Sequence, residues 1–368
     1  MGTPDVEQAV EDDRRRKRPL DGVRILAVEQ MAALPFATQL LARLGAEVVK
    51  VEHPTTGDSG RGSHPAVADP DGRPVGATFL RNNLNKRSLA IDLKQPEGVD
   101  LVLRLAPRFD VFGENFRAGT AARLGIGYEA VRATHPAVVY LSISGFGQDP
   151  ASPYRDMGAY AAIVEGMSGI YEYKRAPGRP PAANPVGALG DISSALFGAV
   201  GVLAALRHRD HTGVGQHIDV AMLDATVAMT DIVANFHSLG VEREWGSGIG
   251  IVETFAASDG HFVLQCVREH HFATLCTEIG CPELADDERF ATRAGWQDHL
   301  DDVLRPAIES WASDRSLAEV VGILSGAGMA CGPSQTSAQV VADPHLAVRN
   351  MLVETLPSDD GNPVLVPG

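Results

Sequence analysis

The sequence predicts an α/β protein: a parallel sheet of the nucleotide-binding type in the first half, followed by a separate, smaller α+β domain. Three observations lead to this prediction. Short apolar strand patterns alternate with helical patterns through the first half of the 368 residues, and such alternation is typical of a parallel sheet. Glycine, proline and serine become dense after Gly145. A chain of this length also corresponds to two or three domains of roughly 100–200 residues.

The first strand–helix–strand unit lies near the N-terminus. Residues 23–28, apolar except for Arg24, form a pattern typical of a short buried strand. A helix is predicted from Pro35 to about Leu44, because proline is tolerated in a first helical turn. Gly45 ends this helix, and residues 46–52 predict a second strand. A helix that connects two neighbouring strands implies that the strands are parallel.

The alternation continues after a long segment rich in glycine, proline and aspartate, residues 58–76, which predicts a surface loop. Further strands are predicted at 87–93, 111–112 and 137–142, and helices at 96–106 and 118–124. Beyond them we predict a long helix from Asp191 to about Arg207, a strand at 215–220 and a helix at 222–236.

The second half predicts a smaller α+β domain. A glycine-rich segment at 246–250 leads to strands at 251–255 and 261–267, and helical patterns follow to Gly328. The predicted organisation is a large domain at 19–225, a small domain at 245–330, a C-terminal return to the large domain at 340–368, and a disordered leader at 1–18.

Composition narrows the classes of ligand. The 32 lysines and arginines against 47 aspartates and glutamates give a net charge of −15, which opposes binding to nucleic acid or to an anionic membrane. The longest apolar run, residues 195–206, is shorter than the roughly 20 residues that span a bilayer, so we expect no membrane helix. The four cysteines lack metal-ligand spacing, and we expect neither metal nor disulfides in a cytoplasmic protein.

Asp191 follows Gly190 at the start of the long predicted helix. Aspartate at such a junction commonly caps the helix by accepting hydrogen bonds from its first amide groups. A carboxylate at the positive end of a helix is also expected to stay ionised and exposed, as a nucleophile requires. Both interpretations remain open for this residue.

Two further patterns concern ligand binding. The segment 246–250 either holds a ligand through its backbone amides or forms a hairpin tip. It lacks the preceding strand and following helix of a dinucleotide fingerprint, so NAD is not expected. Basic residues recur on predicted loops of the first half, which in so acidic a chain favours a phosphate site. These residues are Arg61, Lys86, Arg87, Lys94, Arg117 and Arg123.

An ordered set of short phrases gives the sequence a family resemblance. The phrases are PLDGVRIL at 19–26, LGAEVVKVE at 44–52, NKRS at 85–88 with DLK at 92–94, ENFR at 114–117, SGFG at 144–147, GD at 190–191 and TGVGQ at 212–216. From about Pro19 to its end the chain resembles class III CoA-transferases, the family of formyl-CoA transferase, carnitine CoA-transferase and the 2-methylacyl-CoA racemases. The resemblance implies a Rossmann-like large domain and a small domain joined by two linkers, in a homodimer of interlocked rings.

The resemblance also implies a chemistry in which an aspartate attacks an acyl-CoA thioester, an aspartyl-CoA thioester forms, and a carboxylic acid then takes the CoA. It places the aspartate at Asp191, and a glycine loop that covers it at Gly248. CoA contacts are implied for Met31, Ala32, Ala33, His53, Ile91, Lys94, Asn115, Phe116, Arg123, Leu124 and Met222, with Arg61 in the same basic set. Lys94 and Arg123 are expected to meet phosphates, and Ile91, Phe116 and Leu124 the adenine.

Departures from the family pattern keep two alternatives open. Tyr160 stands where racemases carry a histidine, and a phenol with a pKa of about 10 is a poor proton abstractor, which argues against a racemase or epimerase. Ala161 stands where many transferases keep an acidic residue, which leaves open a non-catalytic CoA-binding subunit of a heteromeric transferase. Family members usually continue past the position of Gly368. The sequence identifies neither the acyl-CoA donor nor the acceptor acid.

Overall fold

The computed structural model describes residues 18–172, 178–183, 187–230, 234–235, 237–240, 250–358 and 360–368. The chain divides into two compact units, each with its own apolar core. The large unit comprises Met1–Gly240 and Val353–Pro367, and the small unit comprises Val241–Leu352 and Gly368. Apart from Arg18, the predicted leader at 1–18 lies outside the described residues.

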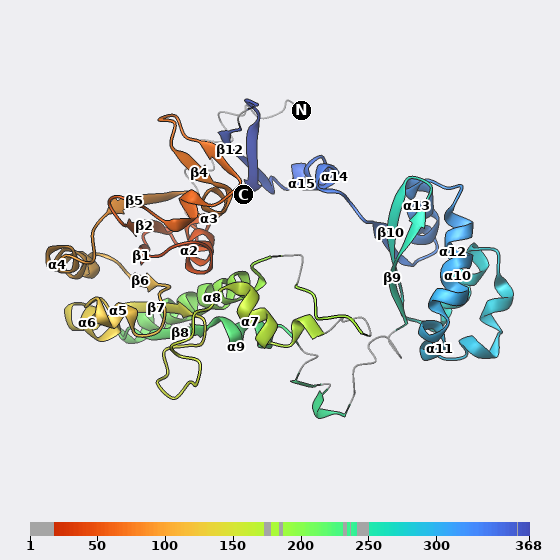
Figure 1. Ribbon diagram of the computed structural model, residues 1–368, viewed down its shortest axis with the longest axis horizontal. Coiled ribbons are helices and arrows are strands. Elements are labelled where there is room, and N and C mark those ends of the chain that lie inside the picture. Colours follow the sequence, from red (N-terminus) through yellow and green to blue (C-terminus); the bar gives the residue numbers. More distant parts are fainter. Residues whose placement is uncertain are drawn as a thin grey trace. The chain divides into compact units, whose positions relative to one another are not determined.

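A sheet of six parallel strands forms the centre of the large unit (Figure 1). The strands are β1 (Arg24–Val28), β2 (Glu47–Glu52), β5 (Lys86–Ala90), β6 (Val111–Glu114), β7 (Val139–Ser144) and β8 (His217–Ala221). They pair in the order β5-β2-β1-β6-β7-β8, which is the strand order of Rossmann folds. The predicted parallel sheet is confirmed. In such sheets ligands bind outside the carboxyl ends of the strands, where the order reverses, here between β1 and β6.

Helices cover both faces of this sheet. One face packs against α2 (Ala33–Arg43), α7 (Ala161–Met167) and α8 (Leu189–Thr212), and the other against α4 (Pro96–Leu105), α5 (Thr120–Arg123) and α6 (Tyr128–Thr134). Along β1, Ile25 and Ala27 belong to the first core, whereas Leu26 and Val28 belong to the second. Because β1 is buried on both faces after Arg24, its sequence is continuously apolar from Ile25 to Val28 instead of alternating.

Helix α8 is long and apolar enough to cross a membrane, and it is the one such helix among the residues that the structure describes. Half of its apolar window is nevertheless buried, and it packs against α2, β7 and β8. Glycine permits this approach: a Cβ atom on Gly201 would lie 2.9 Å from the side chain of Ile218. Helix α8 is therefore a core helix of the large unit.

The prediction that residues 58–76 form a loop is wrong in part. It contains a 3-10 turn, η1 (Ser59–Gly62), and a hairpin of β3 (Ala66–Ala68) and β4 (Pro74–Gly76), and it leads into α3 (Ala77–Asn82). Strands of three residues are too short to show a periodicity, so no pattern in the sequence predicts them. Strand β5 also begins one residue before its predicted start and ends at Ala90. The helix predicted at 222–236 is α9 (Met222–Ala228), and residues 231–233 and 236 lie outside the described part.

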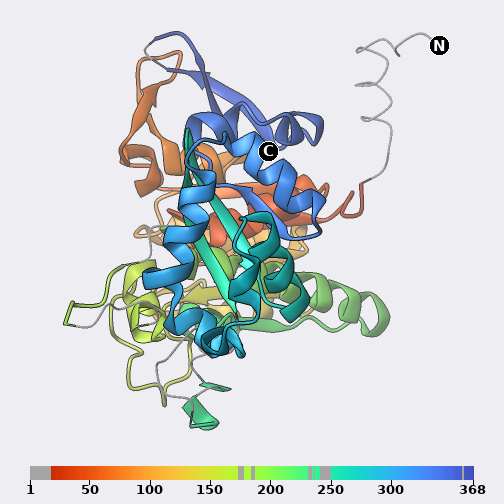
Figure 2. The ribbon, with the colours of Figure 1, turned by 90° about the vertical axis from the view of Figure 1, so that its right-hand side faces the viewer.

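The small unit contains an antiparallel sheet, ordered β11-β10-β9. Its strands are β9 (Ile251–Ala257), β10 (Gly260–Cys266) and β11 (Ala330–Pro333), and its larger helices are α10 (Glu269–Glu278), α11 (Arg293–Asp298), α12 (Arg305–Ala312) and α13 (Leu317–Gly326). Figure 2 shows these helices, in cyan and blue, beside the long strands β9 and β10. Phe255, Phe262 and Trp296 fill the core between helices and sheet.

Short elements complete the chain. They are the 3-10 turns η2 (Ala106–Arg108), η3 (Ile170–Glu172), η5 (Pro282–Ala285) and η6 (Glu288–Phe290), the π-helix η7 (Leu300–Leu304), the helices α14 (Ser337–Val341) and α15 (Pro344–Val348), and the strands β12 (Leu352–Pro357) and β13 (Pro363–Pro367). Strands β12 and β13 pair with each other, and β13 contacts α3 of the large unit.

Candidate active site

A cavity of about 460 Å³ opens at the carboxyl ends of β1, β6 and β7 in the large unit. Its lining includes Met31 after β1, Asn115 and Phe116 after β6, Ser144 at the end of β7, and Asp191 of α8. The Asn115 side-chain amide connects the segments that follow β1 and β6. It accepts a hydrogen bond from the backbone N–H of Gln30 at 3.0 Å and donates one to the Gln30 carbonyl at 2.9 Å. The cavity therefore lies where a sheet of this strand order binds ligands.

Asp191 does not cap its helix. Helix α8 begins at Leu189, after Ala188 in a left-handed conformation (φ 55°), so Asp191 lies within the first turn. The capping interpretation is thus wrong, because the helix begins two residues before Asp191. The carboxylate instead lies in the cavity that Ala33, the first residue of α2, also lines, and the Ala33 backbone N–H lowers its pKa.

Gly190 lets α7 approach the start of α8. A Cβ atom on Gly190 would lie 2.6 Å from the Val164 side chain and 3.3 Å from the Cα atom of Ala161. Such distances leave no room for a side chain, so glycine is required at this contact. The sequence Gly190–Asp191 therefore places the candidate nucleophile directly after the residue at which α7 and α8 come into close contact.

Glu165 of α7 is a second carboxylate beside Asp191, and sequence reasoning missed it. Its side chain is buried, with Oε1 accepting the Gly190 N–H at 3.1 Å and Oε2 accepting the Tyr171 hydroxyl at 2.9 Å. Glu165 lies one helical turn after Ala161, the position that lacks the family's acidic residue. The available signal was a lone acidic residue in an otherwise apolar helix.

Asp191 has a raised pKa. Burial raises it, the Ala33 N–H opposes the rise, and the negative charge of Glu165 adds to it, which gives a value of about 6. The residue is half-buried, so the expectation of an exposed carboxylate is corrected. Among the described residues no lysine, arginine or histidine forms an ion pair with it. Asp191 is therefore ionised at neutral pH yet poorly solvated, which suits a nucleophile.

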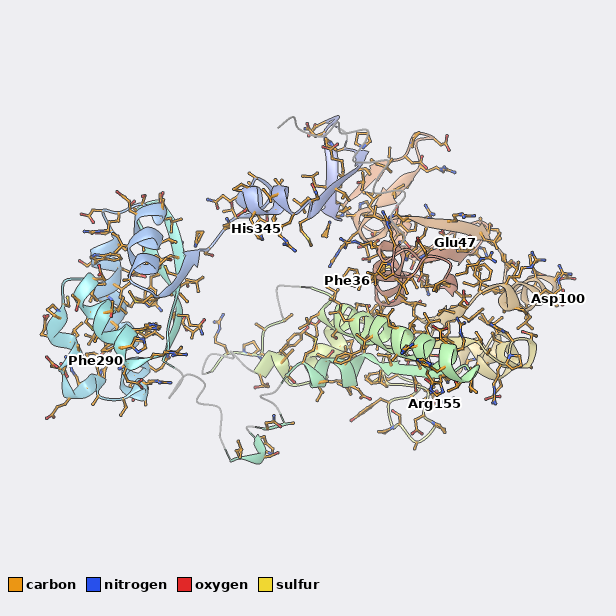
Figure 3. All side chains as sticks on the ribbon, turned by 180° about the vertical axis from the view of Figure 1, so that it is seen from behind. Phe36, Glu47, Asp100, Arg155, Phe290 and His345 are labelled. Carbon is orange, nitrogen blue, oxygen red and sulfur yellow. The ribbon has the colours of Figure 1, made fainter. Side chains whose placement is uncertain are left out.

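Charged and phenolic groups also line the Asp191 cavity. Tyr160, immediately before α7, lines it and is 74% exposed. Arg117 and Arg155, the latter labelled in Figure 3, line it as well. Within the described chain neither arginine forms an ion pair with a carboxylate, and the buried Nε of Arg155 has no hydrogen-bond acceptor. Two guanidinium groups in one cavity with a candidate nucleophilic carboxylate suit the binding of a carboxylic acid.

A second cavity of about 190 Å³ adjoins the first at the carboxyl ends of β1, β2 and β5. Gln30 and Phe116 line both. The structure brings predicted CoA residues together here, namely His53, Ile91, Lys94, Phe116 and Leu124. Lys94 and Leu124 also line a neighbouring hollow with Arg123. An apolar cleft with lysine and arginine at its edge has the chemistry that an adenine and its phosphates require.

Most of the remaining predicted residues lie at the Asp191 cavity. Met31, Ala33, Asn115 and Met222 line the Asp191 cavity, and Ala32 lies between two of them as the N-cap of α2. Gly248 lies outside the described residues. The described residues contain no group of three or more His, Cys, Asp or Glu side chains placed to hold a metal.

Two basic residues of the predicted phosphate set pair with carboxylates of the protein. The Lys86 side chain is 2% exposed and contacts Glu29 at 2.7 Å, so its assignment to a phosphate site is wrong. The reason is that β5 begins at Lys86 and turns this side chain away from solvent. Arg61 makes two bonds to Glu52, at 2.7 and 2.9 Å, and stacks on Phe79. Its guanidinium is used within the protein and lines neither cavity.

A family model for CoA-transferase family III matches residues 20–368, and the chain belongs to this family. The succinyl-CoA–D-citramalate CoA-transferase of Chloroflexus aurantiacus is 35% identical over 92% of this chain and 84% of its own length. The succinate–glutarate CoA-transferase of Agrobacterium fabrum is 34% identical over 97% and 89%. The crystal structure of a CaiB/BaiF family protein from Brucella suis, 32% identical, superposes over 95% of both chains with a TM-score of 0.82. The predicted class III CoA-transferase is confirmed.

Proposed function

We propose that this protein moves CoA from an acyl-CoA donor to a carboxylic acid acceptor through a covalent intermediate on Asp191. The observation that carries the proposal is Asp191 itself, a half-buried carboxylate with a pKa of about 6 and no ion-pair partner among the described residues. It lies in a cavity of about 460 Å³ beside a second, partly apolar cleft. Desolvation leaves such a carboxylate more nucleophilic than one held by a lysine or arginine.

The reaction balances without any further reactant. An Asp191 oxygen attacks the thioester carbonyl, the C–S bond breaks, and an acyl–aspartyl anhydride and a CoA thiolate result. The thiolate attacks the aspartyl carbonyl, which releases the donor acid and leaves an aspartyl-CoA thioester. The acceptor carboxylate attacks that thioester, and the thiolate released then attacks the acceptor's acyl carbon. The products are the new acyl-CoA and the free Asp191 carboxylate.

We propose that CoA lies along the second cavity, with its adenine beside Ile91, Phe116 and Leu124. Lys94 and Arg123 are placed at the edge of this cleft and its neighbouring hollow, where they can neutralise phosphates. The thioester end then enters the Asp191 cavity past Gln30 and Phe116, which line both cavities.

Dicarboxylic acids are the proposed substrate class. Citramalate, succinate and glutarate, which the relatives' names give, each carry two carboxylates. One carboxylate must react at Asp191, and Arg117 and Arg155 offer guanidinium groups to the other within the same cavity.

A homodimer is proposed as the working form, with interlocked subunits as the family resemblance implies. The outer face of α8 exposes Leu196, Phe197 and Val200, the last of them by 64%. Contiguous apolar side chains on a helix surface are typical of protein interfaces. A second copy of this chain is the proposed occupant, which sedimentation of the pure protein tests.

Replacing Asp191 by Asn tests the mechanism. We expect transfer to fall by at least about 10³-fold, because the nucleophile is lost. In the wild type, acyl-CoA followed by hydroxylamine should mark Asp191 alone, as peptide mass analysis would show. The matched control is Asp210→Asn, an exposed carboxylate on the same helix α8. Near-normal turnover by Asp191→Asn would contradict the proposal.

Two measurements on the wild-type protein distinguish the transferase from a racemase and from a non-catalytic CoA-binding subunit. Exchange of the α-proton of a 2-methylacyl-CoA in deuterated water, without an acceptor acid, would identify a racemase. Tight CoA binding with no transfer to any acid in a panel would identify a non-catalytic subunit.

A further inference from the structure

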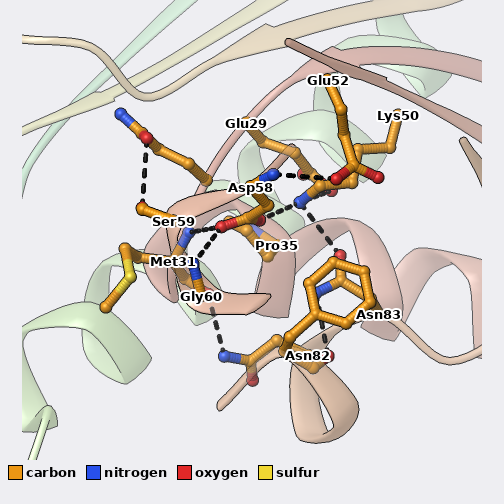
Figure 4. A network of polar contacts seen from close by, with 12 residues as sticks. Glu29, Met31, Pro35, Lys50, Glu52, Asp58, Ser59, Gly60, Asn82 and Asn83 are labelled. Carbon is orange, nitrogen blue, oxygen red and sulfur yellow. Dashed lines mark hydrogen bonds and ion pairs between the residues drawn. The ribbon is translucent and has the colours of Figure 1, made fainter. Parts of the chain in front are cut away.

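A closed set of mostly buried charges lies beside the loop that follows β1, and Figure 4 labels Glu29, Lys50, Glu52 and Asp58 among its members. Its members are three carboxylates and three cations, namely Glu29, Glu52, Asp58, Lys50, Arg61 and Lys86. Lys50 contacts Asp58 at 2.5 Å and Glu29 at 3.6 Å, while Lys86 contacts Glu29 at 2.7 Å. The formal charges cancel, so each buried carboxylate has its cation.

The third cation of this set is Arg61, which pairs with Glu52 at 2.7 Å. It is the only one of the three whose side chain reaches solvent, because the side chains of Lys50 and Lys86 are each 2% exposed. We call these six residues the charge network.

Asp58 connects the charge network to the loop after β1. One carboxylate oxygen, Oδ2, pairs with Lys50, and the other, Oδ1, accepts the backbone N–H of Met31 at 3.0 Å and that of Gly60 at 2.6 Å. The backbone N–H of Asp58 donates to Glu52 at 2.9 Å. Both oxygens and the backbone of Asp58 are therefore fixed.

Met31 has a backbone conformation that needs such support. Its φ is 64°, in the left-handed region that residues other than glycine rarely adopt. Asp58 holds its N–H, and the Asn82 side chain donates to its carbonyl at 3.2 Å. A strained conformation of this kind persists only where its surroundings impose it.

The turn at Met31 sets the position of a backbone N–H beside Asp191. Ala33 follows Met31 by two residues and begins α2, its N–H lowers the pKa of the Asp191 carboxyl, and Met31, Ala33 and Asp191 line one cavity. We propose that Asp58 is a positioning residue for the transfer reaction, which holds the Met31 turn so that the Ala33 N–H is aimed at Asp191. The inference rests on the proposed covalent role of Asp191.

The groups that face Asp191 determine how a displacement of the Met31 turn would change its pKa and orientation. Glu165 faces it from α7, Tyr160, Arg117 and Arg155 line the same cavity, and α2 offers the Ala33 N–H. This N–H favours the ionised carboxylate, so its loss makes Asp191 harder to ionise and leaves it less well oriented. The expected results are a lower kcat and an acidic limb at higher pH.

The test is the rate at which acyl-CoA and hydroxylamine mark Asp191 in a single turnover, measured across pH. For Asp58→Asn we expect labelling about 10- to 100-fold slower than in the wild type, with its half-maximum at higher pH. For Asn82→Ala, which removes one neutral bond to the Met31 carbonyl, we expect about fivefold slower labelling. Asn82→Ala leaves the charge network intact, and it tests the role of the Met31 turn if Asp58→Asn does not fold.

Asp110→Asn is the matched control. Asp110 accepts bonds from Arg209 and from the Arg24 backbone N–H at the opposite end of the sheet, so its loss lowers stability without touching the Met31 turn. Wild-type rates and pH dependence in both Asp58→Asn and Asn82→Ala would overturn the proposal, as would an equal shift in Asp110→Asn. Absence of any label on wild-type Asp191 would instead overturn the proposed mechanism.

Discussion

The charge network and the Asp191 cavity lie at the same edge of the parallel sheet, and both contain buried carboxylates. Burial alone would raise the pKa of Glu52, but bonds from Arg61, Ser88 and the Asp58 N–H outweigh it and lower the value to about 2. In the cavity, burial raises the pKa of Asp191 to about 6, against a single backbone N–H. The difference is a paired cation, which Glu52 has and Asp191, among the described residues, lacks.

The cations divide in the same way. Lys50, Lys86 and Arg61 are paired within the protein. Lys94, Arg117, Arg123 and Arg155 line cavities and, in the described part of the chain, form no ion pair with a carboxylate. In the large unit, the paired cations of the charge network hold the fold, whereas the cations that line the cavities are left for ligands.

The largest expected effect comes from breaking the network. Lys50→Met leaves Asp58 buried without its cation, which should lower the free energy of unfolding by about 3–5 kcal/mol. Urea unfolding measures the loss. The control is Arg104→Met, which removes an exposed pair with Asp100 and should cost no more than about 0.5 kcal/mol. Equal losses in the two variants would contradict the comparison.

Glu114 is a buried carboxylate that, within the described residues, forms no ion pair, so it should behave like Asp191. Burial raises its pKa from 4.5 to about 7, against bonds from Ser142 and the Phe116 N–H. Because the folded pKa is the higher one, the stability that this group contributes is complete below about pH 4.5 and is lost as pH rises through about 7.

Glu114→Gln removes that pH dependence. We expect the variant to be more stable than the wild type by about 1–3 kcal/mol at about pH 8, with the advantage disappearing toward pH 4.5. Thermal unfolding across this range measures it. The same difference in Tm at both ends of the range would contradict the prediction.

Lys94 tests whether an unpaired cation serves a ligand. Lys94→Ala should raise KM for acyl-CoA about tenfold with kcat unchanged, because a charged bond to phosphate is lost. The rise should shrink at high ionic strength. Arg87→Ala is the control, since Arg87 pairs with Glu47 at the surface. Similar KM values for the two variants would show that Lys94 does not meet the phosphates.

The smallest expected effect concerns Glu165. Glu165→Gln keeps an acceptor for the Gly190 N–H but removes the negative charge that raises the pKa of Asp191. The acidic limb of kcat should therefore move to lower pH, by up to about one unit. This shift of the acidic limb is opposite in direction to the shift expected for Asp58→Asn. A shift to higher pH would contradict the assigned electrostatic role.

Much of the fold was predictable because its signals are local. Apolar runs, Pro35 and Gly45 predicted the strands and helices around β1 and β2, and the Gly190–Asp191 phrase predicted the candidate nucleophile. The β3–β4 hairpin was missed because three-residue strands show no periodicity. Glu165 was missed because its role depends on α7 meeting α8 at Gly190, a contact that the sequence does not display.

The sequence by itself determined a parallel α/β sheet, the family and the aspartate proposed to carry the chemistry. Only the tertiary structure decided which charges are paired. Lys86 and Lys94 are eight positions apart and chemically identical, yet one is buried against Glu29 and the other lines the second cavity. The pKa of Asp191 likewise depends on Ala33 and Glu165, which approach it from other helices. Burial and pairing arise from such distant contacts, so a local pattern cannot fix them.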